Sequence, residues 1–94
     1  MISKDLLKHK ILNIIEPTII SEEFYTDNSV SIFDKDIIQY ADIDSLKYVE
    51  LFMELEKAFN ISISDNSIVN FLDNERNINI NKLTDFVYDF FEKH

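Results

Sequence analysis

Residues 44–65 read DSLKYVELFMELEKAFNISISD and predict a helix that carries apolar side chains on two opposite faces. We expect the helix to begin at Asp44 or Ser45 and to run to Phe59, because Asn60 tolerates the left-handed backbone angles that often end a helix. At about 100° per residue, one sector of the helix holds five large side chains and is expected to face the core. These residues are Tyr48, Leu51, Phe52, Leu55 and Phe59.

The nearly opposite side of the same helix carries a narrower apolar strip, which consists of Leu46, Val49 and Met53. These residues follow one another at spacings of three and four and therefore share one face. Three carboxylates frame the strip, from Glu50, Glu54 and Glu56. Two interpretations stay open. Either another part of the chain covers the strip, or the strip is a docking surface for a transient partner.

Amphipathic segments on both sides of this helix complete an all-α pattern. From Ser3 to Glu16, apolar residues recur at i, i+4, i+7 and i+8, with Ser3 as the N-cap and Pro17 as the stop. A short helix is expected at residues 65–72, capped by its first residue, and a last helix follows a cap at Asn81. The inward side chains of the short helix are expected to be Ile68, Val69, Phe71 and Leu72.

Residues 18–42 show no sustained periodicity and form a long first connection. Single helical turns are expected to start near Ser21 and near Asp34. A connection of this length inside a compact domain is more often functional than not. The expected fold is an all-α four-helix bundle with three long helices, one short helix and a long first connection.

The composition indicates one domain, residues 1–94, because 46% hydrophobic residues can form one core but not two in a chain this short. The absence of cysteine excludes disulfides and thiolate nucleophiles, and the absence of glycine excludes glycine-rich phosphate loops. His9 and His94 are far apart in sequence, and the acidic clusters lack the glycine of a calcium loop. We expect neither a metal site nor a catalytic residue.

The net charge of −9 points to basic protein partners, because it repels nucleic acid and anionic membrane surfaces. The first fifteen residues, MISKDLLKHKILNII, are interrupted by charges and lack the unbroken apolar run of a signal peptide or membrane span. The sequence therefore predicts a cytoplasmic protein. Nothing in it requires more than a monomer.

Asp44, Ser45 and Leu46 give the helix at 44–59 a D-S-L start. A structural role alone explains the first two residues, since a serine caps a helix start and an aspartate is favoured at the positive end of the helix dipole. A tripeptide of this kind also arises by chance. The three residues are weak grounds for a function without their surroundings.

Residues 44–65 as a whole resemble the acyl and peptidyl carrier proteins, in which the serine of such a tripeptide carries 4′-phosphopantetheine. The first and last helices fit this family more loosely, so the resemblance extends over most of the chain. There are departures from the family pattern. Asp42 stands where many members have glycine, Lys47 interrupts the acidity after the serine, and the connection at residues 72–80 is longer than usual.

The resemblance implies a fold of the acyl-carrier type, with Ser45 as the attachment serine and Asp44 as the acid before it. It implies a 4′-phosphopantetheine arm that derives from coenzyme A and carries acyl or aminoacyl thioesters for fatty-acid, polyketide or nonribosomal-peptide biosynthesis. The apolar strip and Glu50 match the positions at which carriers meet their enzymes, and Glu54 and Glu56 extend this acidic frame.

The implied partners are a phosphopantetheinyl transferase and acyl-transferring or acyl-activating enzymes with basic docking patches. The chain itself is expected to catalyse nothing. The alternative is an unmodified acidic helical adaptor that binds a basic partner through the same strip.

Overall fold

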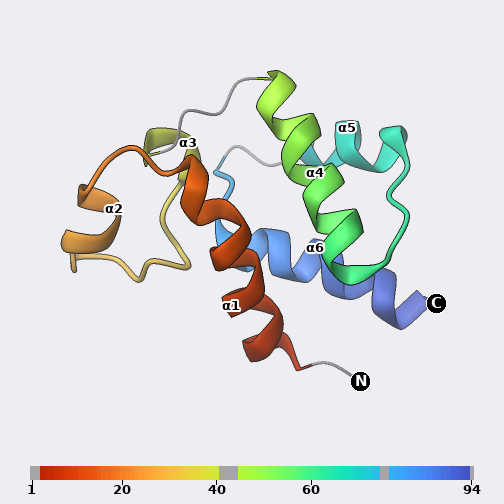
Figure 1. Cartoon of the computed structure of the whole chain (residues 1–94), viewed down its shortest axis with the longest axis horizontal. Coiled ribbons are helices and arrows are strands. Elements are labelled where there is room, and N and C mark those ends of the chain that lie inside the picture. The colour runs from red at the N-terminus through yellow and green to blue at the C-terminus, as the bar shows by residue number, and fades with distance from the viewer. Residues whose placement is uncertain (1–2, 41–44, 75–76, 94) are drawn as a thin grey trace.

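The computed structural model shows an all-α bundle and describes residues 3–40, 45–74 and 77–93 (Figure 1). The four-helix arrangement with a long first connection is confirmed. The elements, in chain order, are α1 (Lys4–Ile15), the 3₁₀ turn η1 (Glu16–Thr18), α2 (Glu23–Thr26), α3 (Ile37–Tyr40), α4 (Ser45–Phe59), α5 (Asp65–Asn74) and α6 (Ile80–Lys93). Within the described residues, no helix is long and apolar enough to cross a membrane.

The core lies where α1, α4 and α6 meet. Each of these helices buries one apolar face, and the inward face of α4 packs its rings edge-on against the neighbouring helices. The ring centroids of Phe52 and Phe86 are 5.6 Å apart, and those of Phe59 and Phe91 are 6.0 Å apart. The fully buried side chains of the three helices include Leu7, Ile11, Ile15, Phe52, Leu55, Leu83 and Val87.

The ends of α1 and α4 follow the sequence closely. Ser3 caps α1, since its Oγ accepts a hydrogen bond from the N–H of Leu6 at 3.2 Å. Pro17 ends α1 as an α-helix, but the chain continues through η1 for one 3₁₀ turn. Asn60 adopts a φ of 54°, the left-handed geometry expected after α4.

The starts of α5 and α6 correct two predicted caps. The side chain of Ser64, not Asp65, accepts a hydrogen bond from the N–H of Ser67 at 3.1 Å. Asn79, not Asn81, accepts one from the N–H of Lys82 at 2.8 Å. In both cases the acceptor is the residue just outside the helix, because only its side chain reaches the unpaired N–H three residues on.

The length of α5 and one of its inward residues also differ from the prediction. The helix runs to Asn74, two residues past the expected end at Leu72. Val69 is 52% exposed, although the sequence pattern places it inward. Ile68, Phe71 and Leu72 are partly buried against the core. A narrow inward face is enough to hold a helix that lies at the side of the bundle.

The long first connection folds around the buried side chain of Lys35. Its ammonium group donates hydrogen bonds to the carbonyl oxygens of Glu23 at 3.0 Å, Phe24 at 2.8 Å and Asp27. The same group lies 5.7 Å from the ring centroid of Tyr40. These carbonyls belong to the last turn of α2 and to the residue after it, so the lysine ties α2 to α3.

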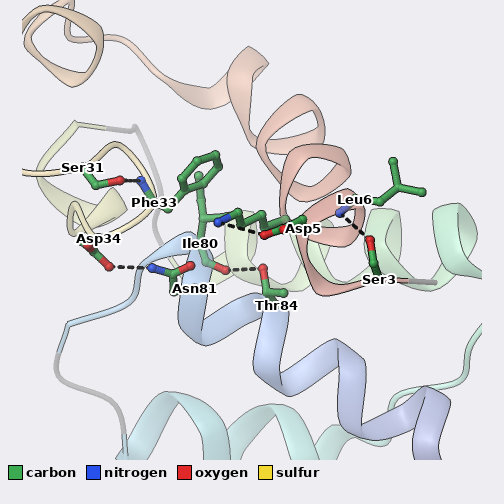
Figure 2. A network of polar contacts seen from close by, with 10 residues as sticks. Ser3, Asp5, Leu6, Ser31, Phe33, Asp34, Ile80, Asn81 and Thr84 are labelled. Carbon is green, nitrogen blue, oxygen red and sulfur yellow. Dashed lines mark hydrogen bonds and ion pairs between the residues drawn. The ribbon is translucent and has the colours of Figure 1, made fainter. Parts of the chain in front are cut away.

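The connection also binds to the start of α6 (Figure 2). The side-chain amide of Asn81 donates to the carboxylate of Asp34, and its backbone N–H donates to the carbonyl of Phe33 at 3.1 Å. The N–H of Ile37 donates to the carbonyl of Ile78 at 2.9 Å. These contacts hold α3 and the segment before it against the start of α6.

Candidate docking and attachment site

The apolar strip of α4 faces solvent in the residues that the structure describes. Val49 is 48% exposed and Met53 is 50% exposed. Neither the long connection nor α5 buries them, so the interpretation that another part of the chain covers the strip is wrong for these two residues. The side chain of Leu46 lies outside the described part of the chain.

The carboxylates around the strip have different surroundings. Glu50 and Glu54 are exposed, and Glu54 forms an ion pair with Lys57 at 3.8 Å. Glu56 is partly buried, and its carboxylate accepts a hydrogen bond from the N–H of Ile63 at 3.3 Å. Glu56 therefore helps to hold the connector between α4 and α5, while Glu50 and Glu54 are open to an incoming group.

Ser45 is the first residue of α4. The family resemblance implies that this residue is the attachment serine. Its side chain and the whole of Asp44 lie outside the described residues, so their geometry stays a prediction. The first turn of α4 contains no acidic residue. The unpaired N–H groups and the dipole at a helix start favour a negative group, and here no carboxylate of that turn opposes it.

Tyr48 lies one turn further along α4, on the side opposite the strip. Its hydroxyl is buried and has no hydrogen-bond partner within the described residues. Burial raises the pKa of Tyr48 to about 12, and the negative charge of Asp36 adds to this shift. The carboxylate of Asp36, just before α3, thus acts electrostatically on the first turns of α4.

A cleft of about 460 Å³ lies between α4 and the end of α1 with η1. The sequence pattern did not predict it, because it forms where two segments far apart in the chain pack side by side. Its lining comes from Asn13, Ile14, Pro17 and Thr18 on one side and from Lys47, Glu50, Leu51 and Glu54 of α4 on the other. No set of three or more acidic, histidine or cysteine side chains suited to a metal occurs in the described part of the chain.

One stretch of 29 residues is 62% identical to a protein named acyl carrier protein from Phytoplasma australiense. The match covers 31% of this chain, and the chain spans 38% of the length of that relative. No protein-family profile matches the chain. No solved structure matches it either. The partial match agrees with the family resemblance of the sequence, and the all-α fold is consistent with it.

Proposed function

We propose that this chain is a carrier protein that holds acyl or aminoacyl intermediates as thioesters on a 4′-phosphopantetheine arm attached to Ser45. The observation that carries the proposal is that α4 begins at the serine of the D-S-L tripeptide and then presents exposed Val49 and Met53 beside an acidic flank. The partial similarity to an acyl carrier protein supports the same role.

The start of α4 suits a phosphodiester. The helix has 15 residues, so its dipole is fully developed, and its first turn is free of carboxylates. In the modification reaction, the hydroxyl oxygen of Ser45 bonds to the pantetheine-bearing phosphorus of coenzyme A, and the bond to the nucleotide portion breaks. The serine proton passes to a base of the separate transferase. The arm supplies the thiol on which the thioester forms.

The strip and its acidic flank suit short-lived contacts with several enzymes. Val49 and Met53 offer a small apolar area, and exposed carboxylates speed association with basic surfaces more than they prolong it. We propose that Glu50 and Glu54, with Leu46, take part in this docking, whereas Glu56 acts at its edge. We propose that the carrier acts as a monomer in the cytoplasm. Fatty-acid, polyketide and nonribosomal-peptide intermediates are all compatible with this role.

The proposal is tested by incubating the protein with coenzyme A and a promiscuous phosphopantetheinyl transferase, followed by mass measurement. The native chain is expected to gain one phosphopantetheinyl group. Ser45→Ala is expected to gain none, and Ser62→Ala, which changes an exposed serine in the connector after α4, is expected to gain one. An unmodified native chain would instead favour the acidic adaptor that binds partners without an arm.

A further inference from the structure

The cleft between α1 and α4 combines an apolar lining with an acidic edge. Its apolar walls are Ile14 and Pro17 from the first segment, which lie beside the polar Asn13 and Thr18, and Leu51 from α4. Leu51 is buried and Ile14 is partly buried, so these walls belong to the packed body of the molecule. Glu50 and Glu54 line the cleft from the exposed flank of α4. The cleft therefore offers an apolar surface within reach of two carboxylates.

Glu50 and Glu54 also separate the cleft from the apolar strip. They lie four residues apart on α4 and hence next to each other on its surface. Around the helix axis, Val49 and Met53 fall on one side of this acidic pair, and Leu51 falls on the other side. A partner that contacts the strip can thus reach across the acidic pair into the cleft.

We infer that the cleft receives a long basic side chain, arginine in particular, from a partner protein that docks on α4. This inference rests on the proposed carrier function and extends its docking surface from α4 to α1 and η1. The aliphatic stem of an arginine packs on apolar walls while its guanidinium stays at a polar edge. The fork of its N–H donors matches carboxylates such as those of Glu50 and Glu54.

The charge distribution selects a cationic occupant. The chain carries a net charge of −9, which disfavours an anionic ligand at a carboxylate-lined cleft. Lys47 also lines the cleft and opposes a cation, and Lys57 lies 3.8 Å from the carboxylate of Glu54. Glu50 and Glu54 should therefore strengthen binding of a cation, and Lys47 should weaken it. Removal of the two glutamates and removal of the lysine should therefore change the affinity for a cation in opposite directions, and one cationic probe can measure both changes.

The probe is n-butylguanidinium, titrated into the unmodified, isotope-labelled protein and followed by amide chemical shifts in NMR spectra. We expect saturable shifts at Ile14, Thr18 and Leu51, which line the cleft. The double variant Glu50→Gln with Glu54→Gln is expected to bind the probe about three- to tenfold more weakly. Lys47→Gln is expected to bind it more tightly.

Two controls make the outcome decisive. The double variant Glu22→Gln with Glu23→Gln removes two exposed carboxylates at α2 and is expected to leave the affinity unchanged. Pentanoate and pentanol, of similar length, are expected to bind more weakly than the cation. Equal binding of either compound, or an affinity unaffected by the changes at Glu50 and Glu54, would overturn the inference. The titration needs no pantetheine arm, so its failure is distinguishable from failure of modification at Ser45.

Discussion

Lys35 is 5% exposed, so its ammonium group lies inside the molecule. Its ammonium group donates to the carbonyl oxygens of Glu23, Phe24 and Asp27 at the end of α2. The carbonyl of Glu23 also accepts a hydrogen bond from the N–H of Asp27 at 3.0 Å. Burial of a charge is unfavourable unless such partners are present. The buried lysine therefore stabilises the first connection. Its position between two aspartates in the sequence did not predict this role.

Replacement of this side chain tests its structural role. Lys35→Met keeps much of the aliphatic volume but removes the ammonium donor from three carbonyls, of which that of Glu23 keeps the N–H of Asp27. We expect the free energy of unfolding to fall by about 2–4 kcal/mol, measured by urea denaturation. Lys10→Met, at an exposed position of α1, is expected to change it by less than about 0.5 kcal/mol. Equal stability of the Lys35 variant and the parent would contradict the role.

Tyr48 is the second buried polar group with an unusual environment. Its raised pKa means that the fold accommodates the neutral phenol and disfavours the phenolate. The associated stability is fully present below the ordinary pKa of 10.0 and is lost as the pH rises toward about 12. Alkaline conditions should thus destabilise the fold around Tyr48.

Removal of the Tyr48 hydroxyl tests both its contribution to stability and its part in the alkaline titration. Tyr48→Phe is expected to keep or slightly increase the free energy of unfolding at neutral pH, because the lost hydroxyl had no partner. Ultraviolet titration should show that the tyrosinate step near pH 12 disappears, whereas Tyr25→Phe, at an exposed position, should retain it. Persistence of the step in Tyr48→Phe would show that another tyrosine causes it.

At the scale of the helices, α4 shows how far periodicity predicts structure. Its inward face and the second apolar strip opposite to it follow from the spacing of side chains, and its end follows from the backbone tolerance of Asn60. The spacing left open whether the strip is covered, and the structure shows Val49 and Met53 exposed. The cleft beside Glu50 depends on where α1 and η1 pack, and the caps at Ser64 and Asn79 depend on local hydrogen-bond geometry. Tertiary packing and residue-level geometry are not visible in a pattern of apolar and polar residues.

The strip on α4 allows a test of docking that does not disturb the core. Val49→Asp combined with Met53→Asp should leave the helical circular dichroism intact, because both side chains are half exposed. The rate of pantetheinyl transfer to Ser45 should fall about tenfold, equivalent to a loss of about 1.4 kcal/mol in transition-state binding. Leu6→Asp, at an equally exposed position on α1, is the matched control.

Three outcomes of this comparison are informative. A slower reaction in the double variant alone assigns docking to the strip. Equal rates in the double variant and the parent would remove the strip from the docking surface. Loss of helicity in the double variant would place Val49 and Met53 among the residues that the fold requires, contrary to their exposure.

At the scale of the whole molecule, the fold is predicted from the sequence more completely than the function. The arrangement of helices follows from three strong amphipathic patterns, and the structure confirms it. The attachment role of Ser45 comes from the family resemblance, because an ordinary structural role in the first turn of a helix explains the same residue equally well. Similarity to an acyl carrier protein over 29 residues supports the class of function, and the cargo stays open.

The chain offers a direct way to locate the arm. Trypsin is expected to cut after Lys35 and Lys47 and to release residues 36–47, DIIQYADIDSLK, in which Ser45 is the sole serine or threonine. Fragmentation of this peptide, from protein treated with coenzyme A and a phosphopantetheinyl transferase, measures the site of attachment. We predict that it carries one phosphopantetheinyl group on Ser45. An unmodified peptide, or a group attached elsewhere in the chain, would contradict the carrier assignment.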